Sequence, residues 1–403
     1  MKVYVAPCGL GLGHIMRCEP VARKLQSKGV DVVFSTYLDG LDYAKRAGFK
    51  LMESVSISFQ VKLDGTIDFK RTAATSGFSL GFHRFMKQVT GEIKNMRSYG
   101  PDVVLSDSRA SSLVAARMLG LPTVLILNQY RVDIVDRPTW GSMSLFDRFF
   151  FIVANVFWVF IRTLIEGVWA LSQIILIPDW PSPFTISIGN LAIPTRYAKK
   201  VKFIGPLVTA KQVNEESQAR LKRSIGVSAE KPLVYAGVSG PKVERKYLAD
   251  TLIEIFRSFP RDYEIILSRG DPRGSAKHIR VGNLKVFDWI ENQIDYVRAC
   301  DALVGRAGHG TIVKAITCGK PIVLIPIPDH MEQHRNAQRA VELGVAKIVA
   351  QENLNSSLLL EAIVEVLSSG VYANRSAAAA KMARELDGIG VATELTLHMA
   401  RHS

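Results

Sequence analysis

Short apolar runs alternate with segments of helical periodicity through the first two hundred residues. The run "KVYVAPC" (residues 2–8) precedes "HIMRCEPVARKLQSKG" (residues 14–29), whose apolar positions recur at helical spacing and which ends at Gly29. The run "VDVVFST" follows, and further on "PDVVLSD" and "PTVLIL" enclose the helical stretch "ASSLVAARMLG". Strands that alternate with helices in this way predict a parallel sheet covered on both faces.

The second half repeats the alternation, with predicted strands at "PLVYAGVSG", "YEIILSRG", "LKVFDW", "ALVGRAG" and "PIVLIPI". We place the domain boundary in "KKVKFIGPLV", where a basic run leads into Gly205-Pro206. The pattern therefore predicts an α/β protein with two doubly wound, Rossmann-like domains, residues 1–203 and 204–385, and a final helix at 386–403. Ligands of such sheets bind at the carboxyl ends of the strands, so we expect the site in a cleft between the domains.

One segment departs from this pattern. "RFFFIVANVFWVFIRTLIEGVWALSQIILIP" (residues 148–178) is apolar around most of a helical circumference, and we assign an inserted amphipathic helical segment to residues 146–177. Such a segment either lies in the plane of a membrane surface or is buried, as a helix pair against the sheet or in a dimer. Polar residues disfavour a transmembrane helix, which needs about 20 apolar residues. These polar residues form one narrow stripe: Arg148, Asn155, Arg162, Glu166 and Gln173.

Charge narrows the choice of partners. The 403 residues carry a formal net charge of +14, which predicts an anionic partner such as a phosphorylated substrate or an anionic membrane surface. No nucleic-acid-binding motif is present, so we do not expect nucleic acid. The four cysteines lack the spacing of a metal site, and a reduced, cytoplasmic setting is the default.

The first glycine loop, "PCGLGLGHIMR", follows a predicted strand and precedes a helix. Its Gly11 and Gly13 place free helix amides and the positive end of the helix dipole where an anion binds. The spacing is not the GxGxxG of dinucleotide-binding enzymes. His14 follows the loop and is a candidate general base, although it can also cap the helix. Asp107 ends another strand of the same domain, where it either orients His14 or caps the next helix.

The second glycine loop lies in "GRAGHGTIVKAITCGKP" (residues 305–321). The main-chain amides of Gly308 to Thr311 can converge on a diphosphate, and Arg306 adds a positive charge. A further strand-to-glycine turn contains Ser239 and Gly240. There is no Walker motif, which disfavours a P-loop kinase.

These motifs together resemble those of the GT-B glycosyltransferases, over essentially the whole chain. "GLGLGHIMR" resembles their amino-terminal glycine-and-histidine loop. "FDWIENQIDYVRACDALVGRAGHGTIVKAITCGKPIVLIPIPDHMEQHRNAQRAVELG" resembles their donor-binding block from end to end. The resemblance extends to the bacterial enzymes that add N-acetylglucosamine to the lipid-linked peptidoglycan precursor, and to the UDP-glycosyltransferases.

The resemblance implies a role for each matching residue. His14 is implied as the base that deprotonates the acceptor hydroxyl, with Asp107 as its partner. For two further residues the alternative to ligand binding is a structural role: Trp289 would pack in the core, and Glu332 would lie at a solvated helix end. The implied donor-binding residues are Trp289 and Ile290 for the base, by stacking and main-chain bonds, Gly308, His309, Gly310 and Thr311 for the diphosphate, and Glu332 and Gln333 for the sugar hydroxyls. Arg306 stands where the family has His or Arg, and Ser239 and Gly240 are further candidates for donor binding.

Lys314 is the departure from the family pattern, because a glutamate that binds the ribose hydroxyls is usual at this position. A lysine donates to a hydroxyl but cannot accept from one. Lys314 therefore either binds the nucleotide differently or turns outward with its stem along the helix. This substitution leaves the identity of the nucleotide open.

The resemblance implies an inverting transfer from a UDP-sugar to a lipid or lipid-linked acceptor, on the cytoplasmic face of the membrane, with neither metal nor cofactor. The chain lacks the DxD motif of metal-dependent enzymes. The final helix is expected to cross back over the first domain. Two alternatives remain at this stage: a UDP-sugar 2-epimerase of the same fold, and a nucleotide-sugar-binding subunit without catalysis. A homodimer also remains open.

Overall fold

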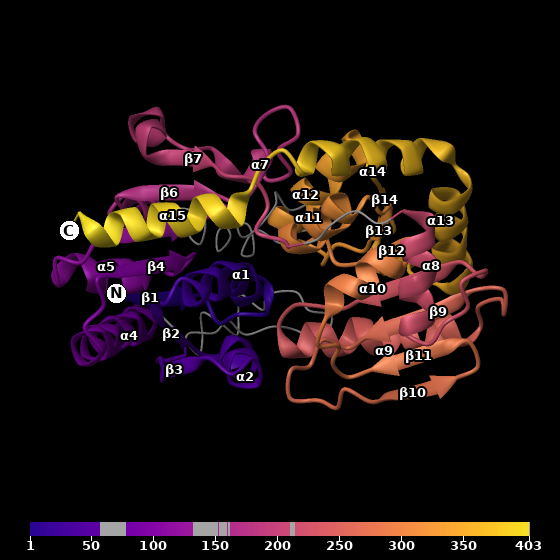
Figure 1. Cartoon of the computed structure of the whole chain (residues 1–403), viewed down its shortest axis with the longest axis horizontal. Coiled ribbons are helices and arrows are strands. Elements are labelled where there is room, and N and C mark those ends of the chain that lie inside the picture. The colour runs from indigo at the N-terminus through magenta and orange to yellow at the C-terminus, as the bar shows by residue number, and fades with distance from the viewer. Residues whose placement is uncertain (57–77, 132–151, 153–158, 160–161, 210–213, 403) are drawn as a thin grey trace.

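The computed structural model describes the chain apart from residues 57–77, 132–151, 153–158, 160–161, 210–213 and 403. Two α/β domains lie side by side (Figure 1). The amino-terminal domain contains a seven-stranded parallel sheet in the order β3-β2-β1-β4-β5-β6-β7. Its strands are β1 (Lys2–Pro7), β2 (Asp31–Thr36), β3 (Lys50–Glu53), β4 (Val103–Asp107), β5 (Thr123–Ile126), β6 (Ile174–Ile177) and β7 (Val201–Phe203).

Apolar residues on both faces of the central strands explain why this sheet is covered on both sides: every residue of β4, β5 and β6 is buried. One face packs against α1 and the other against α4 and α5. The helical elements of this domain are α1 (Gly13–Ser27), α2 (Leu38–Arg46), α4 (Phe78–Tyr99), α5 (Ala110–Met118), α7 (Ile188–Leu191) and the 3-10 helix η2 (Thr195–Lys200).

The carboxy-terminal domain contains a second seven-stranded sheet in the order β10-β11-β9-β8-β12-β13-β14, in which only the exposed edge strand β10 is antiparallel. The strands are β8 (Leu233–Gly237), β9 (Glu264–Ser268), β10 (His278–Val281), β11 (Leu284–Phe287), β12 (Ala302–Gly305), β13 (Ile322–Leu324) and β14 (Ala346–Ile348). The helices are α8 (Glu215–Ser224), α9 (Lys242–Arg257), α10 (Gln293–Ala299), α11 (His309–Cys318), α12 (Met331–Glu342), η3 (Gln351–Asn353), α13 (Ser356–Ser368) and α14 (Gly370–Ala383).

The two sheets confirm the predicted α/β architecture. The prediction of a helical segment at 146–177 is wrong at its carboxy-terminal end. Residues 174–177 form the buried strand β6, between β5 and β7. Gln173 does not belong to a helical stripe either, because its Oε1 accepts hydrogen bonds from the amide and hydroxyl of Thr123. Four consecutive apolar residues suit a strand covered on both faces as well as they suit an apolar helix. Residues 162–169 are helical, and most of the segment before them lies outside the described residues.

The last helix, α15 (Gly388–Arg401), lies along the amino-terminal domain (Figure 1). Ile389, Ala392 and Leu397 join the core between this domain's sheet and α1. The chain crosses between the domains at two segments that touch, because a Cβ at Gly388 would lie 2.5 Å from the carbonyl oxygen of Gly205. Only glycine permits this approach, which fixes the two crossings against each other.

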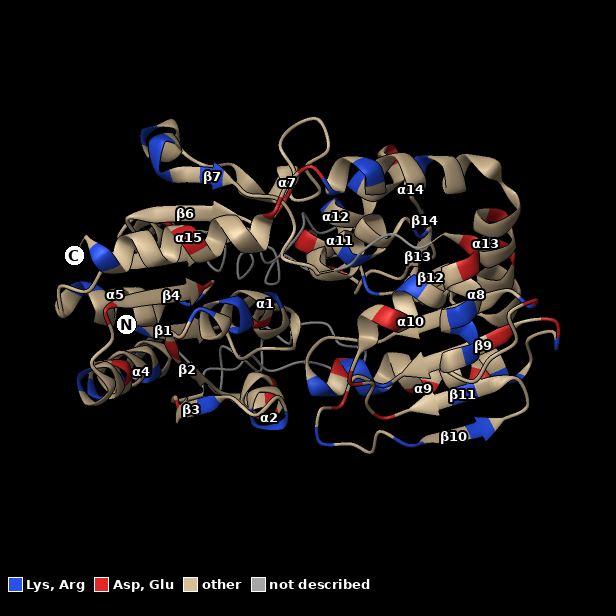
Figure 2. Ribbon diagram, viewed as in Figure 1, with Lys and Arg blue, Asp and Glu red and all other residues tan. Residues whose placement is uncertain are grey.

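Polar contacts join the domains around a shared cleft. Arg46 of α2 pairs with Glu291, and Arg245 of α9 pairs with Asp39 across 3.2 Å. The loop after β6 reaches into the other domain, where Asp179 lies 3.1 Å from the imidazole of His309. Figure 2 shows charged residues of both signs where α2 meets the start of α9. The described structure therefore holds the two domains in contact on both sides of the cleft.

No single helix among the described residues is long and apolar enough to cross a membrane. One pair, residues 356–368 with 370–401, passes that test of length and hydropathy together, but it is bent by 66°.

A buried ion pair holds the turn that follows β4. Arg109 donates to Glu92 of α4 across 2.5 Å, and the two side chains are 2% and 0% exposed. Glu92 also accepts from Tyr4 and Ser35. The ion pair thereby ties α4 to the carboxyl end of the sheet.

Replacing Glu92 with Ala leaves the Arg109 guanidinium buried and unpaired, so we expect Glu92→Ala to lower the free energy of unfolding by about 3–5 kcal/mol. Urea unfolding followed by circular dichroism measures the change. The matched control is Glu394→Ala, which breaks the exposed pair with Lys28. Equal effects of the two substitutions would contradict the structural role of the Glu92–Arg109 pair.

Candidate functional site

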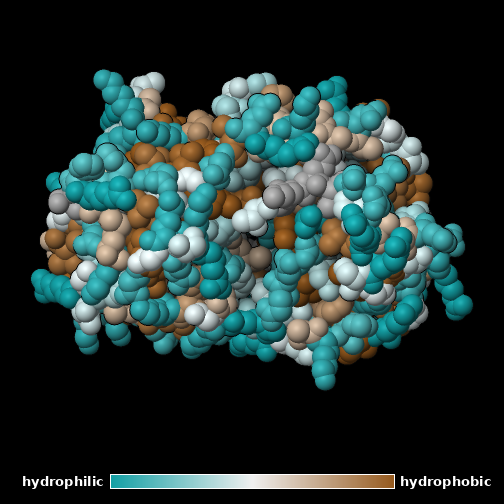
Figure 3. All heavy atoms as spheres, in the orientation of Figure 1, coloured by the Kyte–Doolittle hydropathy of each residue, from teal (hydrophilic) through white to brown (hydrophobic). Residues whose placement is uncertain are grey.

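A cavity of about 850 Å³ lies between the domains, within the range of small-molecule sites. Figure 3 shows the molecular surface hollowed where the two domains meet. The first glycine loop and the turn after β4 form one wall, and the turns after β8, β12 and β13 form the other. Carboxyl ends of strands from both sheets therefore face the same space, as the topology requires.

Backbone strain is concentrated around this cavity. Of the four described non-glycine residues with positive φ, three line it: Leu38, Ser108 and Asp329. Such conformations each cost about 1–3 kcal/mol and are retained where the surrounding structure imposes them. Ser108 directly follows Asp107, so the strained turn helps to aim that carboxylate at α1.

His14 and Asp107 are brought together from α1 and β4. Asp107 Oδ1 lies 2.8 Å from His14 Nδ1, and the His14 side chain is 27% exposed. Asp107 only accepts, so His14 carries the proton on Nδ1 and its Nε2 lone pair is free for a substrate proton. His14 makes no capping bond, and α5 begins after Arg109 rather than at Asp107. The capping alternatives for both residues are therefore excluded.

Sequence reasoning missed Arg17, the third member of this cluster. Its Nε donates to Asp107 Oδ2 at 2.7 Å and its Nη2 to Oδ1 at 2.5 Å. Burial would raise the pKa of Asp107, but the charges and hydrogen bonds of Arg17 and His14 hold it well below the usual range. Asp107 is therefore ionised at neutral pH. The sequence did carry a signal for Arg17. It lies three residues after His14, and residues three apart share one face of a helix.

The amino terminus of α11 opens into the cavity through Gly308, Gly310 and Thr311. Gly308 precedes the helix in extended conformation and no side chain caps it. The first-turn amides and the helix dipole are thus directed at an anion. Gly11 and Gly13, at the start of α1, face the same cavity. Two helix termini therefore present positive potential to one space.

Lys314 lies one turn after Gly310 on the same face of α11 and lines the cavity. Burial lowers the pKa of its ammonium group. Among the described residues its side chain forms no hydrogen bond or ion pair. The alternative that it turns outward is wrong, because the side chain faces the cavity rather than bulk solvent.

Arg306 does not supply a free positive charge, so that part of the prediction is wrong. The side chain is 1% exposed and its Nε donates to Glu244 at the start of α9. Its two terminal nitrogens donate to Ile325 O at 2.9 Å and to Gln351 Oε1 at 2.6 Å. The guanidinium therefore supports the loops beneath the cavity, and its charge is balanced by Glu244.

Ser239 and Gly240 line the cavity directly above this ion pair. Gly240 has a φ of 132°, and a Cβ on it would lie 1.9 Å from Glu244 Oε2. Only glycine fits this turn. Burial raises the pKa of Glu244, against the opposing effect of Arg306.

The Trp289 side chain does not face the cavity, so stacking of a base on Trp289 is wrong for this structure. The indole is 2% exposed, packs edge-on to Tyr43 with ring centroids 5.7 Å apart, and donates to Glu291. Trp289 is therefore a core residue, as the alternative prediction stated. The Ile290 side chain is buried in the carboxy-terminal core, and its main-chain contact with a base stays a prediction.

Glu332 and Gln333 lie at the start of α12 and line the cavity. Gln333 Oε1 accepts from the Ile327 amide at 3.1 Å. Glu332 Oε1 accepts at 2.9 Å from Asn128 Nδ2, which comes from the opposite domain. Sequence reasoning also missed Asn128. It lies two residues after β5 and directly follows the apolar run "PTVLIL", where a polar residue at the end of a predicted strand was a detectable signal.

His309 lines the cavity but turns its Nε2 to Asp179, and its Nδ1 has no partner among the described residues. Asp179 also accepts from the amides of Ile186 and Ser187 and from the Ser187 hydroxyl. These bonds and the charge of His309 lower the pKa of Asp179 despite its burial. His309 thus docks the loop after β6 on α11.

Comparisons with known proteins show which proteins the chain is similar to. Residues 244–389 match the glycosyltransferase family 28 C-terminal domain. The chain is 26% identical over 395 residues, 96% of each chain, to an uncharacterised glycosyltransferase of Methanosarcina acetivorans. It is 25% identical, over 91% of this chain and 90% of the relative, to a Bacillus cereus UDP-N-acetylglucosamine--N-acetylmuramyl-(pentapeptide) pyrophosphoryl-undecaprenol N-acetylglucosamine transferase.

Solved structures share the fold over nearly the whole length. The calicheamicin glycosyltransferase CalG4 superimposes with a TM-score of 0.64 at 13% identity, covering 100% of this chain and 99% of that one. Acinetobacter baumannii MurG gives a TM-score of 0.57 at 17% identity, covering 98% and 99%. The chain is a GT-B glycosyltransferase.

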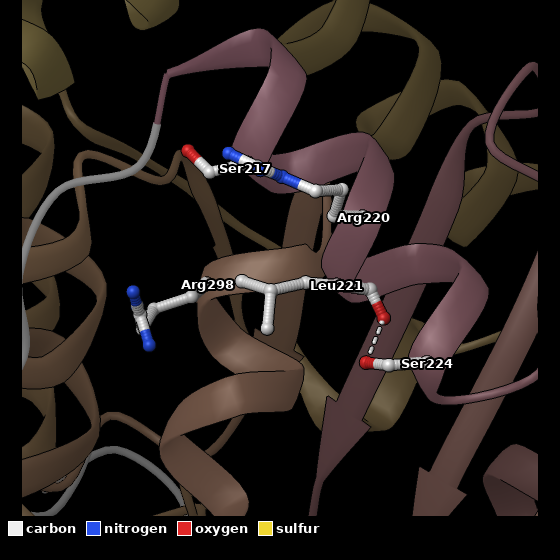
Figure 4. A pocket seen from close by; sticks show the side chains of 5 residues that line it. All are labelled: Ser217, Arg220, Leu221, Ser224 and Arg298. Carbon is white, nitrogen blue, oxygen red and sulfur yellow. Dashed lines mark hydrogen bonds between the residues drawn. The ribbon is translucent and has the colours of Figure 1, made fainter.

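This glycosyltransferase also has a shallow depression of about 370 Å³ between α8 and α10, away from both glycine loops (Figure 4). Arg220 pairs with Glu216, and Arg298 lies 2.9 Å from Asp295. Since its arginine charges are already balanced, the depression is a poor anion site. In the described part of the chain, no three His, Cys, Asp or Glu side chains are grouped as a metal site.

The lowered pKa of Asp107 predicts how the stability of the glycosyltransferase depends on pH. The stabilisation is fully present above the unfolded pKa of about 3.9 and is lost as the pH falls towards the lower folded pKa. Below about pH 4, the stability advantage of the wild type over Asp107→Asn should therefore shrink by about 1.4 kcal/mol per pH unit. Urea unfolding of both proteins at pH 7, 5 and 3 measures this difference. A constant difference would contradict the ionised, paired state of Asp107.

Proposed function

We propose that this glycosyltransferase transfers a hexose or N-acetylhexosamine from a UDP-sugar to a lipid or lipid-linked acceptor, with inversion and without a metal. One observation carries the proposal: the His14–Asp107 pair and the amino terminus of α11 open into one cavity from opposite domains. A base and an anion site on facing walls suit direct displacement at a carbon held between them. The name of the Bacillus cereus relative supports the choice of a UDP-sugar donor and a lipid-linked acceptor.

In this mechanism, His14 Nε2 takes the proton of the acceptor hydroxyl. The acceptor oxygen forms a bond to the anomeric carbon while the bond from that carbon to the diphosphate oxygen breaks. Asp107 stabilises the resulting imidazolium and fixes its orientation. The first-turn amides of α11 and the ammonium of Lys314 stabilise the negative charge on the departing nucleoside diphosphate. Attack opposite the leaving group inverts the anomeric centre.

Glu332 and Gln333 are suited to the donor sugar, because a carboxylate accepts from hydroxyls and an amide both donates and accepts. On the acceptor side, Met16, Ile165, Trp169 and Leu207 give the cavity an apolar wall. Ile165 and Trp169 come from the described part of the apolar segment. That wall supports an acceptor with an apolar portion near its reacting hydroxyl.

The surface of the amino-terminal domain supports action at an anionic membrane. Lys200 donates to the carbonyls of Ala170 and Ser172, so η2 packs against the end of the helix at 162–169. This neighbourhood exposes basic and apolar side chains together, which is the composition of a membrane-surface contact. Its exposed residues are Leu164, Leu171, Arg196, Lys199, Lys202 and Phe203. Figure 2 shows basic residues on η2 and β7, and Figure 3 shows apolar surface beside them.

Replacing His14 with Ala removes the base but no contact to the diphosphate site. We expect UDP release to fall by about 10²- to 10⁴-fold, with UDP affinity changed less than about two-fold. The assay uses a panel of UDP-sugars with a lipid extract, and calorimetry measures UDP binding. His398→Ala, on the far helix α15, is the control. Absence of UDP release from every donor with the wild type would reject the proposed function.

The membrane proposal predicts that Lys199→Glu with Lys202→Glu weakens binding to vesicles containing phosphatidylserine, because each basic residue contributes about 1 kcal/mol near such a surface. Vesicle sedimentation should show about a ten-fold or greater loss. The matched control is Lys246→Glu with Lys381→Glu, which makes the same charge change on α9 and α14. Equal losses in both variants would point to net charge alone.

A further inference from the structure

A continuous chain of hydrogen bonds connects the base of one domain to the sugar-facing carboxylate of the other. His14 Nδ1 donates to Asp107, and Asp107 accepts two bonds from Arg17. Arg17 Nη1 donates to Asn128 Oδ1 at 2.8 Å, and Asn128 Nδ2 donates to Glu332 Oε1 at 2.9 Å. The chain therefore starts at the proposed base and ends at Glu332.

The chemistry of the two ends fixes the direction of every bond. A guanidinium only donates, so the Asn128 carbonyl oxygen must face Arg17. A carboxylate only accepts, so the Asn128 amide nitrogen must face Glu332. A flipped amide would place donor against donor and acceptor against acceptor. Asn128 is thus held in one orientation from both domains.

The burial of these residues makes the loss of any one hydrogen bond costly. Asn128 is 6% exposed, the Arg17 side chain 10% and the Asp107 side chain 0%, so water replaces a lost partner poorly. All three guanidinium nitrogens of Arg17 are engaged. Its Nη2 also lies 3.2 Å from His14 Nδ1, so a displaced Arg17 changes the surroundings of the imidazole directly.

This inference rests on the proposed function. We propose that Arg17 and Asn128 are positioning residues that couple the orientation of the His14–Asp107 pair to the hydrogen bonding of Glu332 across the cleft. A sugar hydroxyl that binds Glu332 competes with Asn128 for the same carboxylate oxygen. The released amide alters its bond to Arg17, and Arg17 in turn alters its hold on Asp107 and His14. Donor occupancy and base alignment are thereby coupled through five hydrogen bonds.

The test observes His14 in the nucleotide-free protein, so that it does not depend on knowing the donor. The ring ¹⁵N resonances of His14, assigned with His14→Gln, give its tautomer and hydrogen bonding. We expect Asn128→Ala and Arg17→Lys to shift these resonances, although Asn128 does not touch His14. The matched controls are Asn95→Ala, a partly exposed asparagine bonded to one carbonyl, and Arg23→Lys, an exposed arginine on α1. Neither control should move them.

Addition of ligand separates this inference from the proposed function. UDP-N-acetylglucosamine should shift the wild-type His14 resonances more than UDP does, because only the sugar reaches Glu332, and Asn128→Ala should abolish the difference. In turnover, Asn128→Ala should lower kcat by about ten-fold with donor KM changed less than about three-fold. Unmoved His14 resonances in folded Asn128→Ala would overturn the coupling even if transfer is observed. Absence of transfer with shifted resonances would instead reject only the proposed function.

Discussion

The buried carboxylate of Asp107 is the constraint on which the site depends. A fully buried negative charge is tolerated only when it is paired and hydrogen-bonded. Arg17 and His14 meet this requirement from α1, which must therefore begin directly above the end of β4. The strained turn at Ser108 and the buried Arg109–Glu92 pair hold that strand end in place. One electrostatic requirement thus sets the position of the first glycine loop.

The carboxy-terminal domain also contains a buried ion pair, but this pair has a structural role. Arg306 and Glu244 also form a buried pair, but it lies beneath the glycine turn at Gly240 and supports the backbone rather than facing a ligand. The positive potential on this side of the cavity comes from the α11 terminus and from Lys314. A lysine without a partner among the described residues, facing a cavity, is costly for the protein alone. Its charge is best explained by an anionic ligand.

The two domains meet around the cleft through contacts between side chains of both. Trp289 packs on Tyr43 of the facing domain, Asp179 docks on His309, and Asn128 meets Glu332. Each domain thereby contributes side chains that hold residues of the other in place. Three of these six partners, Trp289, Asp179 and Asn128, lie two residues after the end of a strand, where parallel sheets place their functional groups.

The sequence by itself determined the two doubly wound domains, the boundary near Gly205 and the two glycine loops, because alternating strands and helices and strand–glycine–helix turns are local patterns. It also determined that His14 follows a glycine loop and that Asp107 ends a strand, and the resemblance assigned Glu332 and Gln333 to the donor-binding block. Only the tertiary structure decided that residues 174–177 are a central strand, since four apolar residues suit either element. It alone showed that the Arg306 charge is paired with Glu244, that the Trp289 side chain lies outside the cavity, and that Arg17 and Asn128 join the hydrogen-bond network. Side-chain direction follows from partners distant in sequence, and those partners are set by packing.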